Sequence, residues 1–543
     1  MKITLTCLWM LSALTFSHAE IFTAMATMKK ALDIEQQFAV ELKSYVPLIK
    51  DKVRSEKVAR LAEEYGRVAN LSLLQPEAYL ANPVNAYMLC KRFTADLKEV
   101  RELLDSPHLQ QEFDTLIATH RAEAPDREDF DGVIEALLRL QDTYEIPCIR
   151  FVDGTFTSDV NSPRMTASDC FEIGKHAYDR KDSYHSLLWL LESVASLEME
   201  GTYQSMDRVL LLDYLIYALI DQGNNYHAMH YAQQLLDLKP ANPVTVDRIA
   251  SVIDWLHAEI AKENATRLAE GRPIPQLDIL PPVSNKRELS AKHMGKEYVK
   301  YEALCRGEDI MANPYKHDLK CYYSTSDGNP LLLLAPVKVE ELYKSPDILL
   351  YHDVISDGEI EMVKNLSTPI LKRATVNDPN TGRLIYSSYR VSRSSWLYDR
   401  YHEAIVTITK RISAITNLDM TSAEGLQVVN YGIGGQYEPH YDHSRDGVDG
   451  FPVTQGNRVA TWIYYMSDVS AGGYTVFTKV GVKVPPIKGA AAFWWNLKRN
   501  GNGDSMTKHA GCPVLSGSKW VANKWTHIIG QEWRRPCTLN EHE

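Results

Sequence analysis

The sequence lacks an excess of basic residues and, beyond its first residues, any long apolar run. Its 59 lysines and arginines are outnumbered by 70 aspartates and glutamates, and the formal net charge is −11. Nucleic-acid binders draw their affinity from basic surface, so this balance argues against a nucleic-acid partner. A membrane-spanning helix needs about 20 consecutive apolar residues. We therefore expect a chain with no transmembrane segment.

The N-terminus has the pattern of a secretory signal. Lys2 supplies a positive charge, residues 3–16 are mostly apolar, and residues 17–19 are small enough for cleavage. A buried first helix is the alternative, but these flanks favour a signal peptide at residues 1–19. Three triplets match the N-glycosylation pattern of secreted proteins: Asn70-Leu-Ser72, Asn264-Ala-Thr266 and Asn365-Leu-Ser367. We favour Asn264, because a loop is expected to follow it.

Seven of the eight cysteines lie outside the predicted signal, in a protein whose compartment lets disulfides persist. Two pairs are close in sequence, and we predict a bridge in each: Cys305 with Cys321 and Cys512 with Cys537. The others make an odd remainder: Cys90, Cys148 and Cys170. At least one thiol is therefore expected to be free or intermolecular.

The length of 543 residues predicts about three domains. Residues 20–145 read as charged helices with an a/d heptad seam. Its members are Met28, Leu32, Glu35, Ala39, Leu42, Val46, Ile49 and Val53. Such a seam is buried either against a second chain or in an intramolecular hairpin, and both readings stay open. Pro47 should kink or break the run. We predict a coiled-coil-like dimerisation domain.

Residues 160–262 also read as helical, with turn signals between the helices. The expected helices run over 169–180, 183–197, 205–221, 224–237 and 243–262. Gly223, Tyr226, Ala228 and Ala232, closed by Pro240, fit one helix pair of the tetratricopeptide type. We predict two to two-and-a-half such repeats.

The composition then shifts. Residues 263–345 contain a proline-rich stretch that cannot sustain a helix, and we predict a linker with irregular structure. Residues 346–537 show short β-type runs broken by glycine and proline, at 426–431, 458–466, 474–477, 490–495 and 519–529. Many short strands with glycine-rich turns indicate a sandwich or jelly roll. The fold class is thus α+β multidomain, with an all-α N-terminal half and a β-rich C-terminal domain.

A candidate metal site lies in this β-rich domain. His440 and Asp442 are two residues apart, so on a strand both side chains reach one ion. His509, before another predicted strand, is the candidate third ligand. Two imidazoles and one carboxylate leave three coordination positions open, as in non-haem Fe(II) oxygenases. Alone, a His-x-Asp triplet is more often a surface turn.

Lys519 follows His509 on a predicted strand and strengthens this interpretation. A buried lysine is a compact cation that suits one carboxylate of a flexible diacid. The alternative is an exposed strand lysine, which is the commoner case. The neighbouring Trp520 and Trp525 are consistent with an enclosed site.

These residues and their surroundings resemble the collagen prolyl 4-hydroxylase α-subunit family. His440, Asp442, His509 and Lys519 stand at the spacings of 2-oxoglutarate dioxygenases. Longer matches run over residues 428–440, 457–473 and 530–537, and in the helical part over 136–144 and 212–215. The resemblance covers essentially the whole mature chain.

The resemblance implies a double-stranded β-helix (jelly roll) catalytic domain over 346–537. There His440, Asp442 and His509 would bind Fe(II), and Lys519 would pair with the distal carboxylate of 2-oxoglutarate. Further residues would contact this co-substrate: Tyr431, Thr475 and His527. Strand packing is the alternative for the first two. The chain departs from the family at His443 and Thr478, and we expect neither change to affect the ligands, since His443 should point to the opposite strand face.

A substrate role for helical tyrosines also follows from the resemblance. Collagen-like chains favour the polyproline II conformation, which aromatic grooves recognise. Tyr214 and Tyr217 share a helix face, and Tyr184 lies at a position where the family has substrate-binding tyrosines. The alternative is that these rings pack between helices.

The implied activity is hydroxylation of proline at C4 in X-Pro-Gly sequences of procollagen or other collagen-like proteins. 2-Oxoglutarate and O2 would be co-substrates, giving succinate and CO2, and L-ascorbate would rescue oxidised iron. The implied partner is protein disulfide isomerase, as β subunit of an α2β2 tetramer in the endoplasmic reticulum lumen. Two alternatives stay open: a non-catalytic collagen-binding subunit, and a dioxygenase acting on another residue type, such as lysine.

Overall fold

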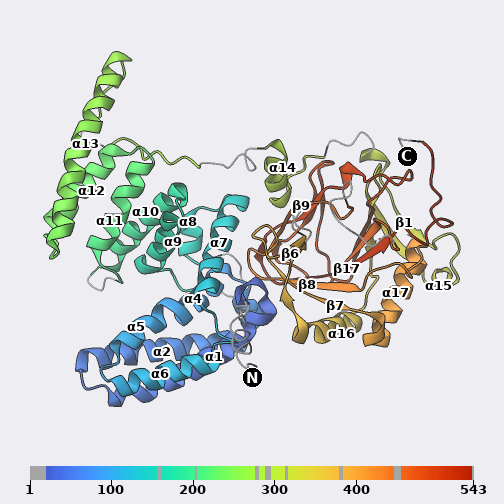
Figure 1. Cartoon of the computed structure of the whole chain (residues 1–543), viewed down its shortest axis with the longest axis horizontal. Coiled ribbons are helices and arrows are strands. Elements are labelled where there is room, and N and C mark those ends of the chain that lie inside the picture. The colour runs from blue at the N-terminus through green and yellow to red at the C-terminus, as the bar shows by residue number, and fades with distance from the viewer. Residues whose placement is uncertain are drawn as a thin grey trace, which may run out of the picture.

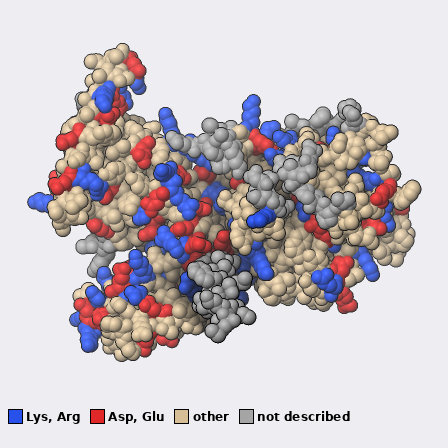
Figure 2. All heavy atoms as spheres, in the orientation of Figure 1, with Lys and Arg blue, Asp and Glu red and all other residues tan. Residues whose placement is uncertain are grey.

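The computed structural model describes residues 20–155, 162–201, 205–275, 280–287, 295–311, 316–377, 383–444 and 454–540. Helices form one side of the molecule and a β domain the other, with α14 (Lys296–Cys305) between them (Figure 1). The predicted signal peptide lies outside the described residues. No described helix is long and apolar enough to cross a membrane. Acidic and basic side chains are interspersed over the face in Figure 2.

The first helices fold back on each other within the chain. Helices α1 (Met25–Tyr45) and α2 (Lys52–Leu74) pack together, and the chain turns between them in the 3-10 segment that contains Pro47. Most of the predicted seam is buried, whereas Val53 is 66% exposed. The structure therefore shows the intramolecular hairpin, and dimerisation stays a prediction. The next helices are α3 Pro76–Leu80, α4 Pro83–Lys91, α5 Leu97–Leu103, α6 Pro107–His120, α7 Arg127–Tyr144 and α8 Cys148–Val152.

The expected tetratricopeptide-type helices are confirmed. They are α9 Ala167–Asp179, α10 Ser183–Glu200, α11 Arg208–Asp221, α12 Asn225–Asp237 and α13 Pro243–Ala269. A capping box of Thr166 and Asp169 starts α9, and Gly223 has a φ of +73° in the turn between α11 and α12. Helix α13 is longer than expected, so Asn264 lies within it and accepts a hydrogen bond from the Tyr226 hydroxyl. The reason for favouring Asn264 as a glycosylation site was therefore wrong.

The β domain consists mainly of two sheets and is the expected jelly roll. The larger sheet has the order β1-β2-β3-β14-β10-β17-β8-β7-β4, and the smaller has the order β13-β12-β15-β9. The strands are β1 Cys321–Ser324, β2 Val337–Tyr343, β3 Ile348–His352, β4 Lys372–Arg373, β5 Val376–Asn377, β6 Leu384–Ile385, β7 Arg393–Leu397, β8 Leu426–Tyr431, β9 Tyr437–His440, β10 Arg458–Tyr465, β11 Ala471–Gly472, β12 Thr475–Phe477, β13 Val482–Val484, β14 Ala491–Trp495, β15 His509–Gly511, β16 Val514–Ser516 and β17 Lys519–His527. Each predicted β-type run contains one of these strands.

The larger sheet is covered on both faces. Helices α16 (Asp357–Ser367) and α17 (Glu403–Thr416) bury residues such as Ile360 and Ile408 in a cluster with Val428. In a second cluster, Phe477 of the smaller sheet packs with Val429 of the larger one. Each such buried aliphatic or aromatic side chain stabilises the fold by about 1.5–3 kcal/mol. The strands between these layers are thus a rigid frame for a site. The short helix α15 (Pro330–Leu333) lies near α17.

The helical part docks directly onto the edge of this frame. The Gly432 amide donates a hydrogen bond to the Thr23 carbonyl at 3.0 Å, and Arg139 donates one to the Gly434 carbonyl at 2.6 Å. A Cβ at Gly434 would lie only 2.7 Å from the Ala136 Cβ. The two glycines after β8 therefore allow the close approach of two domains.

The disulfide pairing differs from the prediction. Cys305 at the end of α14 is bonded to Cys512 just after β15, whereas Cys321 and Cys537 are free and exposed. Helix α14 packs against β12 and buries Cys305 in one apolar cluster with Cys512. The prediction paired cysteines that are close in sequence, whereas the bonded cysteines are close only in the folded structure. Three other described cysteines are free: Cys90, Cys148 and Cys170.

Serine variants distinguish the two pairings. We expect Cys305→Ser with Cys512→Ser to lower the unfolding temperature, because loss of a native bridge costs about 2–5 kcal/mol. The matched pair Cys321→Ser with Cys537→Ser should leave it unchanged. Thermal unfolding and peptide mapping under non-reducing conditions measure both effects. A loss of stability in the second pair as well would restore the original prediction, because each double variant would then break both predicted bridges.

Candidate metal centre

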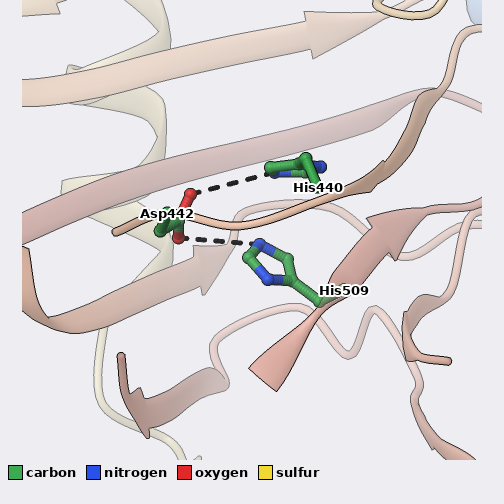
Figure 3. A group of neighbouring side chains, drawn as sticks. All are labelled: His440, Asp442 and His509. Atoms are coloured by element: carbon green, nitrogen blue, oxygen red, sulfur yellow. Dashed lines mark ion pairs between the residues drawn. The ribbon is translucent and has the colours of Figure 1, made fainter. Parts of the chain in front are cut away.

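Three of the predicted site residues meet at one point between the sheets (Figure 3). Strands β9 and β15 are antiparallel, and His440 lies directly opposite His509. Asp442 follows β9, and its carboxylate oxygens lie 3.8 Å from His440 Nε2 and 3.5 Å from His509 Nε2. The three candidate ligand atoms are all within 4.8 Å of one another. Among the described residues, this is the one group of His, Cys, Asp or Glu side chains with metal-binding geometry.

The main chain fixes the orientation of both imidazole rings. His440 Nδ1 lies 2.7 Å from the Glu438 carbonyl, and His509 Nδ1 lies 3.0 Å from the Thr507 carbonyl. A carbonyl oxygen only accepts hydrogen bonds, so each Nδ1 carries the hydrogen and donates it. The Nε2 lone pairs are then free on the side of Asp442, as metal coordination requires.

Burial and charge hold His440 and Asp442 in the protonation states of metal ligands. Burial and the neighbouring His509 lower the pKa of His440 to about 3, so its ring is neutral at neutral pH. Burial alone would raise the pKa of Asp442, but His509, His440 and Arg458 outweigh it and lower that pKa to about 2. A neutral imidazole and an ionised carboxylate are the forms that bind a divalent cation.

A pocket beside these ligands contains three of the four predicted co-substrate residues. Lys519 and Tyr431 face each other across the β17–β8 pair, and Thr475 lines the same pocket from β12. The Lys519 ammonium lies 5.2 Å from the centre of the Tyr431 ring. Burial raises the pKa of Tyr431 to about 12, so its hydroxyl keeps a hydrogen to donate. The Thr475 hydroxyl accepts a hydrogen bond from Tyr465 at 2.9 Å, which leaves its own hydrogen to donate elsewhere.

Lys519 is a buried cation that no described carboxylate neutralises. Its side chain is 2% exposed. Burial is the one cause that lowers the pKa of Lys519 to about 7, with no neighbouring charge opposing it. A Cβ built on Gly511 would lie 3.7 Å from the Lys519 ammonium and 3.8 Å from the Tyr431 hydroxyl. Glycine at this position therefore leaves open the space between the Lys519 ammonium and the Tyr431 hydroxyl. An anionic ligand fits this space.

Other pocket residues were not predicted. The Tyr437 ring stacks on His440 with 3.5 Å between ring centroids, and the Arg390 guanidinium lies 4.7 Å from the Tyr437 ring. Trp525, whose sequence position is consistent with an enclosed site, does line the pocket, whereas Trp520 does not. Arg390 lies in an irregular segment that contacts β9 only after folding, so no local sequence pattern marks it.

One predicted co-substrate residue lies elsewhere, and His443 lies outside the ligand group as expected. His527 does not line the pocket, and its ring contacts the Gly456 carbonyl at 2.6 Å and Glu424 at 3.0 Å. His443, which follows the ligand motif, is outside the metal-binding group and packs against Gly503.

The helical tyrosines form two separate groups. Tyr214 makes edge-to-face contacts with Phe171 and Tyr178, and the Tyr217 hydroxyl accepts a hydrogen bond from Arg248. Tyr184 instead lines a polar cleft between the helical part and β9. All three predicted tyrosines are half-buried. The structure therefore does not place Tyr184 in one groove with the other two.

Comparisons with known proteins match each part of the chain. A family model described as "Prolyl 4-Hydroxylase alpha-subunit, N-terminal region" matches residues 24–158, and a "Prolyl 4-hydroxylase peptide-substrate-binding domain" matches residues 167–258. A model of the "2OG-Fe(II) oxygenase superfamily" matches residues 426–527, which include the three metal-binding candidates and Lys519.

Full-length relatives are also similar. Prolyl 4-hydroxylase subunit alpha-1 of Rattus norvegicus is 41% identical over 531 residues, covering 97% of each chain. Subunit alpha-2 of Gallus gallus is 39% identical over 544 residues, covering 100% of each chain. Subunit alpha-2 of Caenorhabditis elegans is 38% identical over 534 residues, covering 97% of this chain and 94% of that one.

Proposed function

The chain belongs to the prolyl 4-hydroxylase α-subunit family, and we propose that it hydroxylates proline at C4 in X-Pro-Gly sequences of collagen-like proteins. His440, Asp442 and His509 would hold Fe(II). Lys519, with Tyr431 and Thr475, would bind the distal carboxylate of 2-oxoglutarate. When bound, the iron and 2-oxoglutarate supply an oxidative decarboxylation with O2 that yields succinate, CO2 and the hydroxylated residue.

One observation carries this proposal. A complete set of metal ligands and an unneutralised buried lysine lie in a single pocket. Two imidazoles and one carboxylate fit Fe(II) while leaving coordination positions open for a chelating co-substrate and oxygen. The lysine cation fits one end of a dicarboxylate. A collagen-binding subunit without catalysis would need none of these features, so that alternative has no observation in its favour.

The helical part supports the choice of a peptide substrate. The region matched by the peptide-substrate-binding model contains Tyr214 and Tyr217, which lie on α11. Their half-buried rings leave part of each surface open to a ligand. Aromatic rings bind polyproline II chains well, because such chains lose little conformational entropy on binding. We propose that this face of α11 holds the substrate chain.

Tyrosine variants test the peptide-binding face. We expect Tyr214→Ala and Tyr217→Ala each to raise the KM for a Pro-Pro-Gly repeat peptide by about 5- to 10-fold, because an aromatic contact contributes about 1 kcal/mol. The kcat should stay unchanged, since the metal site lies in another domain. Tyr231→Ala, on α12, is the matched control and should leave the KM unchanged. An unchanged KM in the first two variants would mean that these rings only pack between helices.

The remaining family properties are part of the same proposal. L-Ascorbate would reduce iron that becomes oxidised in uncoupled cycles. Protein disulfide isomerase would be the β subunit of an α2β2 tetramer. The mature, glycosylated chain would work in the endoplasmic reticulum lumen after removal of the signal at residues 1–19.

The deciding experiment measures products with the chain co-expressed with protein disulfide isomerase. Fe(II), 2-oxoglutarate, ascorbate and a Pro-Pro-Gly repeat peptide are supplied, and succinate and 4-hydroxyproline are quantified. We expect the two products in equal amounts, and succinate formation that depends on the peptide. A lysine-containing collagen-like peptide without proline in the X-Pro-Gly position is the control and should give neither.

Two results would contradict the proposal. Hydroxylysine from the control peptide would identify a dioxygenase of another residue type. Tight binding of the Pro-Pro-Gly peptide to a folded, iron-loaded complex without turnover would identify a collagen-binding subunit.

A further inference from the structure

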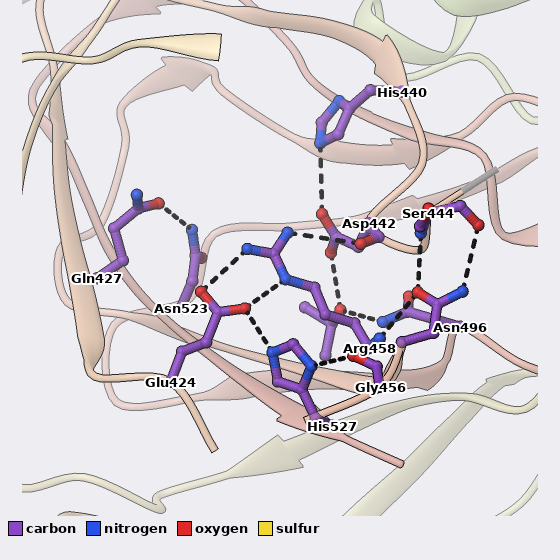
Figure 4. Close-up of polar contacts among 12 residues, drawn as sticks. Glu424, Gln427, His440, Asp442, Ser444, Gly456, Arg458, Asn496, Asn523 and His527 are labelled. Carbon is purple, nitrogen blue, oxygen red and sulfur yellow. Dashed lines mark hydrogen bonds and ion pairs between the residues drawn. The ribbon is translucent and has the colours of Figure 1, made fainter. Parts of the chain in front are cut away.

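Asp442 is held by hydrogen bonds that do not involve the two histidines (Figure 4). The Thr461 hydroxyl donates to Asp442 Oδ2 at 2.7 Å, and the Asn496 side-chain amide donates to the Thr461 hydroxyl at 2.8 Å. Thr461 belongs to β10, and Asn496 directly follows the neighbouring strand β14. The relay Asn496–Thr461–Asp442 thus runs from the larger sheet to the candidate metal site.

The direction of this relay is fixed by chemistry. The Asn496 amide nitrogen can only donate, so the Thr461 oxygen accepts from it. The ionised Asp442 carboxylate can only accept, so the single hydroxyl hydrogen of Thr461 must point at Oδ2. Thr461 thus donates to Oδ2, whereas the second oxygen, Oδ1, lies 3.8 Å from His440 Nε2. Each group in the relay therefore has one possible role.

Thr461 and Asn496 are shielded from solvent. Thr461 and Asn496 are both 0% exposed, and Asp442 is 7% exposed. In such surroundings a charged acceptor gains more from a hydrogen bond than it would in water. Removal of the hydroxyl would leave Asp442 Oδ2 without this donor, at a loss of hydrogen-bond energy to a buried charged group. The carboxylate would then be free to rotate about its χ2 torsion.

The main chain of Asp442 is restrained from another direction. Arg458 lies 3.4 Å from the Asp442 carbonyl, pairs through two nitrogens with Glu424, and stacks at 4.0 Å on Trp525. The His527 ring contacts the same Glu424 carboxylate. Asp442 is therefore positioned at its backbone by Arg458 and at its side chain by Thr461.

We propose that Thr461 is a positioning residue for the metal site. Its hydroxyl, which Asn496 orients, holds the Asp442 carboxylate with one oxygen toward the metal ion. This inference rests on the proposed role of Asp442 as an Fe(II) ligand. Thr461 itself touches neither the metal nor the substrate. Its contribution is to remove the rotational freedom that the carboxylate would otherwise lose on binding the ion.

The test measures metal binding without turnover. The complex with protein disulfide isomerase is stripped by chelation and titrated with Mn(II), whose free signal is followed by electron paramagnetic resonance. Thr461→Val keeps the shape and loses the hydroxyl, and we expect it to weaken Mn(II) binding by about 10- to 100-fold. Thr461→Ser keeps the hydroxyl and should stay within about 3-fold of the natural chain, since its hydrogen bond is retained. Asn496→Ala, which frees the hydroxyl to rotate, should fall between the two.

The result does not depend on the hydroxylase activity. His509→Ala gives the background from sites elsewhere on the complex, and unfolding temperatures confirm that each variant is folded. Unchanged Mn(II) binding in Thr461→Val would overturn the inference, as would equal weakening in Thr461→Ser and Thr461→Val. If Thr461→Val weakens binding but the natural complex turns over no proline peptide, the positioning role holds and the proposed function fails.

Discussion

His509→Ala is expected to abolish peptide-dependent succinate formation. His509 supplies one of three ligand atoms within 4.8 Å of one another, and its Nε2 is aimed at the site by the Thr507 carbonyl. Loss of an outer partner of a metal ligand already costs about 10- to 100-fold, so loss of a ligand itself should exceed about 100-fold in metal affinity or turnover. Succinate release and Mn(II) titration measure the two effects separately.

A neighbouring histidine provides the matched control. His443→Asn changes an imidazole one residue from Asp442, but His443 is outside the metal-binding group. Its Mn(II) affinity should stay within about 3-fold of the natural chain, because no ligand or ligand partner is lost. If His443→Asn were as damaging as His509→Ala, the ligand set would have to be reassigned. Equal unfolding temperatures exclude a general loss of structure.

The sequence pattern predicted the local part of the site. The expected strand at 426–431 is the observed β8, and the expected helices at 169–180 and 183–197 overlap α9 and α10. These signals depend on side-chain periods of 2.0 and 3.6 residues, which are present before folding. The pairing of His440 with Asp442 is equally local, because two residues of one segment provide both ligands. The distant His509 and Lys519 were candidates from their residue types and predicted strands, and the resemblance to a family supported both.

The position of His527 shows how far strand alternation alone can predict. Pocket residues on β17 alternate, as Lys519, Val521, Asn523 and Trp525. His527 continues this series, but it was expected near the co-substrate because of the family resemblance. Each residue adds about 3.3 Å along a strand, and the pocket ends at Trp525, over which Arg458 is stacked. The alternation continues to His527, but this residue lies one step beyond the pocket along the strand.

Contacts between distant segments could not be predicted. Cys305 pairs with Cys512, 207 residues away, because α14 packs against the strands that precede Cys512. Thr461 contacts Asp442 because folding brings β10 next to the segment that follows β9. In each case the partners are set by how the helices and sheets pack, which leaves no periodic trace in the sequence.

Lys519→Met is expected to raise the KM for 2-oxoglutarate by about 100-fold, since truncating one partner of a buried charge pair costs about 2–5 kcal/mol. Methionine keeps the length of the side chain but removes the ammonium, so a bound carboxylate would be buried without its cation. The kcat at saturating 2-oxoglutarate should fall much less, because the metal ligands are unchanged. Lys524→Met is the control: Lys524 is also buried on β17 but does not line the pocket, and its loss should leave this KM unchanged.

The pH dependence of the same constant tests the charge directly. Burial lowers the pKa of Lys519 to about 7 when no anion is bound, so its cationic fraction falls as the pH rises above 7. A dicarboxylate binds the cationic form, and each pH unit above that pKa should therefore weaken binding by up to about 10-fold until the pKa of the bound state is reached. The KM for 2-oxoglutarate should thus rise with pH in the natural enzyme and stay flat in Lys519→Met. A flat profile in both would show that the lysine does not carry the charge that binds the co-substrate, and Arg390, the other cation lining the pocket, would then be the residue to replace.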